Sequence, residues 1–90
     1  MSVNLISDGE VVGQLATNQG HRDLIAYVRG EREAAPHLWQ LLAEAASESV
    51  PQLRKETARA AENCDWKSVK STLENLAALL VRAGKVVVLE

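Results

Sequence analysis

The chain has 90 residues, of which 47% are hydrophobic and 24% charged, and its formal net charge at pH 7 is −2. This composition is typical of a globular domain and excludes a disordered chain, and the length provides one domain but not two. The weak acidic charge gives no general attraction to nucleic acid or to anionic membranes. We therefore predict a single globular domain over residues 1–90.

Apolar runs and cysteine content bear on where the protein acts. The longest apolar runs, such as 77–81 and 86–89, are too short for a transmembrane helix. The first ten residues lack the basic start and the long apolar stretch of a signal peptide. Cys64 is the only cysteine, which excludes an internal disulfide and favours a reducing compartment. These features predict a cytoplasmic protein without membrane contact.

The chain begins with two short segments rich in β-branched and aliphatic residues, 3–6 and 11–15. Between them stands the dipeptide Asp8-Gly9. A tight hairpin turn needs positive φ, which both of these residues tolerate, so Asp-Gly between apolar runs is a strong hairpin signal. The sequence therefore predicts an N-terminal β-hairpin.

Two helices follow the hairpin. Thr17 or Asn18 can cap a first helix that ends before Gly30, whose flexible backbone suits a helix C-terminus. Proline is favoured in the first turn of a helix, so a second helix is predicted over 36–47. Leucines at helical spacing give this second helix one apolar face.

Two further helices complete the helical part. The third is predicted over 50–63, with Ser49 and Gln52 as a capping box. Asp65 is the expected cap of the fourth helix, and Gly84 closes it. The fourth helix carries the clearest apolar stripe in the chain.

The last apolar run, 86–89, consists of Val-Val-Val-Leu. A continuous apolar strand is typical of one that is covered on both faces, so we expect it to insert beside the first strand. The predicted fold is α+β, with the hairpin and this strand forming a three-stranded sheet packed against about four α-helices. Leu89-Glu90 is also the dipeptide that expression vectors leave ahead of an affinity tag.

A polar cluster opens the first helix and includes Gly20, His21 and Arg22. Helix N-termini after a strand attract anions, which makes this cluster a candidate anion-binding site. A single glycine is far from a glycine-rich phosphate loop, however, and the Walker pattern is absent. Capping and dipole electrostatics explain the nearby Asp23 equally well.

Catalytic and metal-binding patterns are lacking. His21, His37 and Cys64 have none of the close spacing that organises a zinc site, so no metal or cofactor is predicted. Cys64 falls on the apolar register of the third helix, which predicts a small buried hydrophobe. Asp8 and Glu10 lie at a hairpin tip, where carboxylates are solvated. No nucleophile, base and oxyanion donor can be placed together, so we predict a protein that is not an enzyme.

Basic residues concentrate in and after the third helix. They suggest an alternative function as a nucleic-acid-associated regulator that would use Arg54, Lys55, Arg59, Lys67 and Lys70. Glu56 and Glu62 interrupt this set, and DNA-reading domains usually show a strong basic bias. A solvated helix face of mixed charge is therefore the favoured interpretation, and nucleic acid is an improbable partner.

Apolar surface is the remaining functional signal. A chain this short can cover one face of a small sheet with helices but hardly both. The candidate interface residues are Trp39, Val86, Val87 and Val88. Exposed apolar patches and aromatic anchors are typical of binding surfaces. We therefore predict a small interaction module that binds a protein partner or itself, comparable to an immunity protein, an antitoxin, a phage-encoded inhibitor or an accessory subunit.

Overall fold

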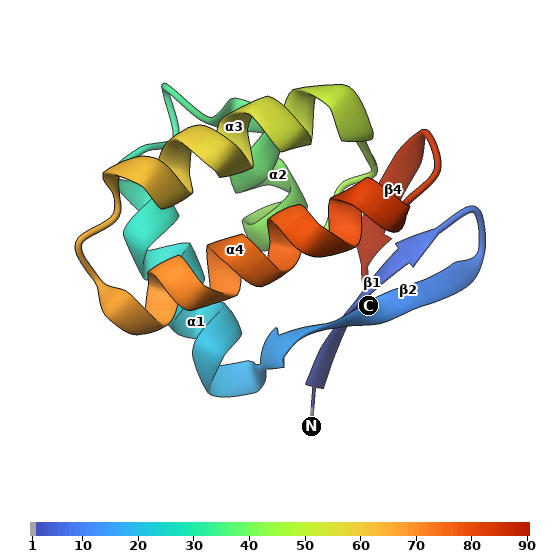
Figure 1. The fold of residues 1–90 in the computed structure, drawn as a ribbon, viewed down its shortest axis with the longest axis horizontal. Coiled ribbons are helices and arrows are strands. Elements are labelled where there is room, and N and C mark those ends of the chain that lie inside the picture. The colour runs from blue at the N-terminus through green and yellow to red at the C-terminus, as the bar shows by residue number, and fades with distance from the viewer. Residues whose placement is uncertain (1) are drawn as a thin grey trace.

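Four helices and a four-stranded antiparallel sheet make up residues 2–90, the part of the chain that the computed structural model describes (Figure 1). In chain order the elements are β1 (Ser2–Ser7), β2 (Glu10–Thr17), α1 (Asn18–Arg29), α2 (Pro36–Glu44), β3 (Glu48–Ser49), α3 (Val50–Asn63), α4 (Lys67–Arg82) and β4 (Val86–Leu89). The predicted α+β fold is confirmed, and the sheet has one short strand more than the three predicted.

The β1–β2 hairpin turns at Asp8 and Gly9, as the sequence predicts. Their φ angles are 54° and 81°, and Ser7 pairs with Glu10 across the turn. Positive φ at both central residues is the signature of a type I′ turn, whose twist matches that of the strands. The register shifts between Val3 and Asn4 and again between Leu5 and Ile6, so the hairpin carries two irregularities.

The terminal strand β4 lies between β1 and β3 in a sheet of order β2-β1-β4-β3. Its predicted place beside the first strand is confirmed, with Leu5 opposite Leu89. The side chain of the buried Ser7 links β1 to the start of β4 and to the residues just before it. Its Oγ donates a hydrogen bond to Val86 O at 3.0 Å and accepts one from Gly84 N at 2.8 Å. Glu90 adds a reciprocal pair of backbone hydrogen bonds with Asn4.

Only one face of β4 is covered, so the expectation that both faces are covered is wrong. Val87 and Leu89 point into the core and are 1% and 8% exposed, whereas Val86 is 46% exposed. The cause is the arrangement of layers, in which all four helices lie on the same side of the sheet (Figure 1). Successive strand residues face opposite sides, so Val88 shares the outer face with Val86.

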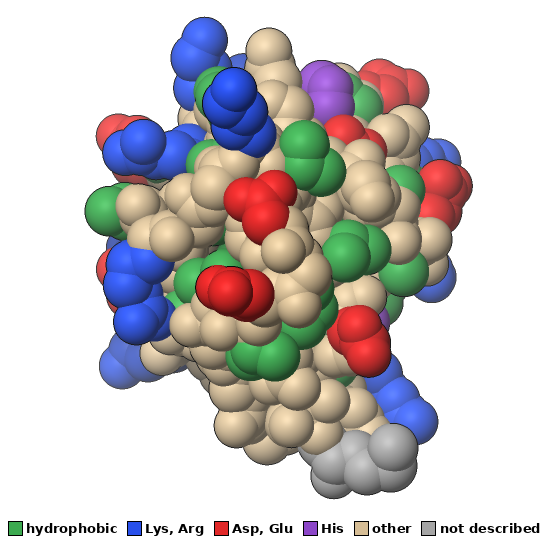
Figure 2. All heavy atoms as spheres, turned by 90° about the vertical axis from the view of Figure 1, so that its right-hand side faces the viewer, with side chains coloured by type: hydrophobic (Ala, Val, Ile, Leu, Met, Phe, Trp, Pro, Cys, Tyr) green, Lys and Arg blue, Asp and Glu red, His purple; other side chains and the backbone are tan. Residues whose placement is uncertain are grey.

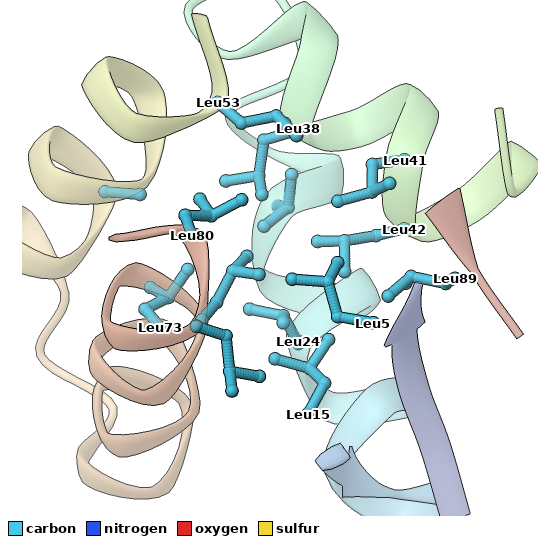
Figure 3. Close-up of a cluster of buried hydrophobic side chains, with 14 of the residues drawn as sticks. Leu5, Leu15, Leu24, Leu38, Leu41, Leu42, Leu53, Leu73, Leu80 and Leu89 are labelled. Atoms are coloured by element: carbon cyan, nitrogen blue, oxygen red, sulfur yellow. The ribbon is translucent and has the colours of Figure 1, made fainter. Parts of the chain in front are cut away.

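Leucine side chains from the helices and from the inner face of the sheet form the core. Figure 3 shows Leu5 and Leu89 of the sheet pointing toward leucines of α1, α2, α3 and α4. The predicted stripe of α4 is confirmed by its buried residues, which are Val69, Leu73, Leu76, Leu79 and Leu80. A Cβ at Gly13 would lie 2.7 Å from Leu79 Cδ2, so glycine permits β2 to approach α4 closely.

The helix ends show which of the predicted capping residues form a cap in the structure. Thr17 caps α1, and its Oγ1 accepts from Gly20 N at 3.1 Å. The capping box at Ser49 is absent, because Ser49 makes no side-chain cap and instead pairs with Val86 in the ladder of β3 and β4. Asp65 does not cap α4 either, since Trp66 occupies the N-cap position.

The second helix is shorter than predicted. It ends at Glu44 rather than around Ser47, because Ala45 takes a left-handed conformation with φ of 50°. The backbone N–H groups of Ala45 and Ala46 both donate to Gln40 O, which closes the helix. This early end frees the chain to extend into β3.

Candidate functional site

The outer face of the sheet carries an apolar row that no helix covers. Ile6 lies opposite both Val11 on β2 and Val88 on β4, so the three side chains cross the sheet on one face. Val11 is 64% exposed, and Ile6 and Val88 are partly exposed. Val86 continues the row along β4. We call Ile6, Val11, Val86 and Val88 the outer-face row.

Figure 2 views the molecule from the side on which the sheet lies in Figure 1. Hydrophobic side chains are spread over this face, acidic side chains stand between them, and Lys and Arg side chains lie toward the margins of the view, with more of them at the left. Glu10 pairs with the buried Ser7 and directly precedes Val11, so its side chain belongs to the helix side of the sheet and not to this face. Glu90 follows Val88 by two positions and therefore belongs to the same face. The row is thus apolar, with the carboxylate of Glu90 beside it.

The long edge of the sheet, formed by β2, is protected against pairing with another strand. Asn75 of α4 donates through Nδ2 to the carbonyl oxygens of Gln14 and Leu15, at 3.0 and 2.9 Å. These bonds and the two irregularities of the hairpin are devices that blunt an edge strand. The opposite edge is β3, which is only two residues long. The sheet therefore offers its outer face rather than its edges.

The structure separates the predicted interface residues into two groups. Val86 and Val88 belong to the outer-face row, whereas Val87 is buried and Trp39 is half-buried against the core from α2. Sequence reasoning did not name Ile6 and Val11, the other members of the row. Strand pairing brings them there, and the alternation of side chains along β1 is the only signal that pointed to Ile6.

The candidate anion-binding residues have mostly internal roles. Gly20 N donates to Thr17, and His21 Nε2 lies 3.0 Å from Leu42 O at the end of α2. A carbonyl oxygen only accepts, so Nε2 carries the proton and His21 satisfies a helix-end carbonyl. Arg22 is exposed. Two of the three residues are therefore already engaged within the protein.

A carboxylate from α3 accepts hydrogen bonds at the N-terminal end of α2. Glu56 Oε2 lies 2.6 Å from His37 Nδ1, and Glu56 Oε1 accepts from Leu38 N at 2.9 Å. The hydrogen bond to Glu56 raises the pKa of His37 above 6.5, with the negative charges of Glu56 and Glu48 adding to the effect and burial opposing it. No sequence pattern signals this pair, because its members come from different helices.

Cys64 is buried, as predicted, and its Sγ donates to Trp66 O at 3.4 Å. It lies near Tyr27, whose hydroxyl pKa is raised first by burial and then by Cys64 and the acidic residues around it. Within residues 2–90, no three histidine, cysteine or acidic side chains gather closely enough to hold a metal ion. None of the helices in this part of the chain combines the length and apolar character that a membrane-spanning segment needs.

The five basic residues of the nucleic-acid alternative lie on three parts of the surface. Arg54 and Lys55 line a groove between α3 and α4, and Arg59 lines a smaller hollow beside Tyr27. Lys67 and Lys70 stand at the beginning of α4. The five are thus divided between two helices, with Arg54, Lys55 and Arg59 on α3 and Lys67 and Lys70 on α4.

Comparison of the chain with protein-family models, with curated proteins and with solved structures finds no match. Arguments about function therefore start from the surfaces of this molecule.

Proposed function

We propose that the chain is a non-enzymatic protein-interaction domain that binds a partner protein through the outer face of its sheet. The observation that carries the proposal is the uncovered outer-face row, with Val11 64% and Val86 46% exposed. Burial of apolar surface drives most protein association, and an apolar row on a small monomer marks the place where such burial is available.

The charges around the row favour a different protein over a second copy of this chain. Glu90 is exposed on this face beside Val88, so two copies meeting face to face would bring like charges into the same interface. Like charges across an interface are unfavourable, whereas opposite charges speed association and fix its register. The partner we propose has an apolar patch with a Lys or Arg side chain placed to meet Glu90.

The experiment compares captured partners of three forms of the full chain. Val11→Ser with Val86→Ser removes the most exposed part of the row, and Trp66→Ser is the matched control, because Trp66 is 43% exposed but stands at the start of α4, away from the row. A partner captured from lysate is purified, and its affinity for each form is measured by calorimetry. We expect at least tenfold weaker binding for the double variant and no more than twofold for the control.

Equal affinity for the wild type and the double variant would contradict the proposal. Light scattering on the purified chain gives a second, independent result. If the wild type is a stable dimer and the double variant is a monomer, the face binds a second copy of the chain. That result would overturn the charge argument.

A further inference from the structure

A groove runs between α3 and α4, on a part of the surface separate from the outer-face row. The two helices are antiparallel neighbours, drawn side by side in Figure 1. The groove consists of two adjoining hollows of about 490 and 530 Å³, which share Pro51, Arg54 and Val81. Neither hollow is used by the function proposed above.

The floor of this groove is apolar and built from short side chains. It is formed by Pro51 and Ala58 of α3 together with Ala77 and Val81 of α4. Val81 is 66% exposed, the highest value among the exposed large hydrophobic residues. Alanines leave room for another backbone to approach, and an exposed valine between them provides an uncovered apolar contact.

The rim of the groove is positive. Arg54, Lys55 and Lys85 line the two hollows, and no acidic residue does. Among residues 2–90, the one ion pair joins His37 and Glu56, so these three cations have no carboxylate partner in the described part of the chain. The chain as a whole carries a net charge of −2. Three of its ten Lys and Arg side chains thus stand beside this apolar floor, with no acidic residue among the lining.

We propose that this groove binds an acidic amphipathic α-helix of a partner protein. Two antiparallel helices already provide ridges and a groove of the kind into which a third helix packs, at an axis separation of about 8–10 Å. The apolar stripe of the bound helix covers Ala58, Ala77 and Val81, and its acidic flanks meet the cationic rim. Helix-in-groove recognition of this kind uses apolar residues at positions i, i+3, i+4 and i+7.

The charge distribution along the groove also indicates where the acidic residues of the bound helix lie. Glu62 follows Ala58 by four residues and Glu74 precedes Ala77 by three, so both lie at the end of the groove remote from Lys85. The lined part of α3, residues 51–58, is about 12 Å long at the rise of an α-helix. A partner helix of two to three turns therefore fills it, with its acidic residues concentrated near Lys85.

Nucleic acid fits this groove less well, although the rim is basic. Single strands are held by aromatic stacking platforms along a continuous positive track. The groove offers no aromatic side chain, and its floor of Pro51, Ala58, Ala77 and Val81 has no side-chain donor. Apolar contact flanked by charge is the chemistry of an amphipathic peptide.

A peptide selection on the full-length chain tests the proposal directly. A display library of random 16-residue peptides is selected on the chain, and the enriched sequences are scored for net charge and helical apolar periodicity. We expect acidic peptides with apolar residues at helical spacing. In two-dimensional NMR spectra of the labelled chain, they shift the amides of Ala58, Ala77 and Val81 and leave Ile6 and Val11 in place.

Charge-reversal variants supply the matched controls. Arg54→Glu with Lys55→Glu reverses the rim, while Lys67→Glu with Lys70→Glu changes the net charge equally at the other end of the helix pair. We expect the rim variant to weaken peptide binding at least tenfold and the control no more than twofold. Val81→Asp weakens binding as the rim variant does, and Val11→Ser with Val86→Ser leaves it unchanged.

Three results would overturn the proposal: enrichment of peptides that are not acidic, peptide-induced shifts that map outside the groove, or equal weakening by the two charge-reversal variants. The alternative outcome is that a labelled single-stranded RNA binds more tightly than the selected peptides do. If the rim variant also loses this RNA binding, the groove is assigned to nucleic acid. Circular dichroism and thermal melts of every variant separate lost binding from lost fold. Because the outer-face variant is a control here, failure of this proposal is distinguishable from failure of the function proposed above.

Discussion

Glu56 of α3 lies 2.6 Å from the His37 ring nitrogen of α2 and also accepts a hydrogen bond from the backbone of that helix at Leu38. The second helix has no side-chain cap of its own at its N-terminus. One carboxylate therefore satisfies a free N–H and places negative charge at the positive end of the helix dipole. With His21 at the Leu42 carbonyl, both ends of this nine-residue helix are held by neighbouring helices.

The His37–Glu56 pair predicts a dependence of stability on pH. The folded protein raises the pKa of His37 above 6.5, so it binds the proton more tightly than the unfolded chain does. The contribution of the pair is therefore complete below pH 6.5 and is lost as the pH rises through the folded pKa. Urea unfolding between pH 5.5 and 8.5 measures this slope, and NMR titration of His37 gives the folded pKa. A slope of the same size in His37→Gln would contradict the assignment.

Removal of the carboxylate itself tests its role as a cap. Glu56→Ala leaves Leu38 N without its acceptor, and we expect the free energy of unfolding to fall by about 1–3 kcal/mol. The side chain of Glu56 is only 12% exposed, so water replaces it poorly. Glu62→Ala, on the exposed side of the same helix, is the control and should change stability by less than about 0.5 kcal/mol. Denaturant unfolding measures both, and equal effects would refute the capping role.

The other end of α2 gives a parallel prediction. His21→Ala removes the donor to Leu42 O and should lower the free energy of unfolding by about 0.5–1.5 kcal/mol. Hydrogen exchange should quicken mainly in α2, because its C-terminal carbonyls lose a partner from outside the helix. Arg22→Ala, an exposed neighbour, serves as the reference. Unchanged exchange in α2 would show that His21 does not hold the helix end.

A stabilising substitution is predicted at the left-handed residue that ends α2. Ala45 has φ of 50°, which is strained for a residue with a Cβ and free for glycine. Ala45→Gly should therefore raise the free energy of unfolding by about 0.5–1 kcal/mol. Ala43→Gly, within the same helix, should lower it by about 0.5–1 kcal/mol. Thermal melts of the two variants should shift in opposite directions, and a common direction would contradict the argument.

Features that depend on neighbours in sequence could be predicted, and features that depend on distant contacts could not. Asp8-Gly9 and the cap at Thr17 act within four residues, so their patterns indicated the hairpin and the start of α1. The capping-box pattern at Ser49 failed because the ladder with β4 holds that residue in an extended strand. A two-residue strand made of Glu48 and Ser49 has no apolar alternation by which the sequence could reveal it.

The candidate surfaces show the same division. A strand with one buried face needs apolar residues only at alternate positions, so the continuous run 86–89 pointed to Val86 and Val88. The structure places both outside the core. Ile6 and Val11 join them only through strand pairing, which no local pattern specifies. The groove between α3 and α4 was likewise hidden, because Lys85 meets Arg54 only once the two helices pack as antiparallel neighbours.

The central position of β4 has a consequence for the order of folding. The hydroxyl of Ser7 reaches Val86 across 79 positions of sequence, and closing so long a loop costs about 4 kcal/mol of chain entropy beyond a constant term. The hairpin and the helix pair form from local contacts, whereas β3 has no strand partner until β4 arrives. Since Val86 and Val88 belong to that strand, the outer-face row is complete only when β4 has paired with β1.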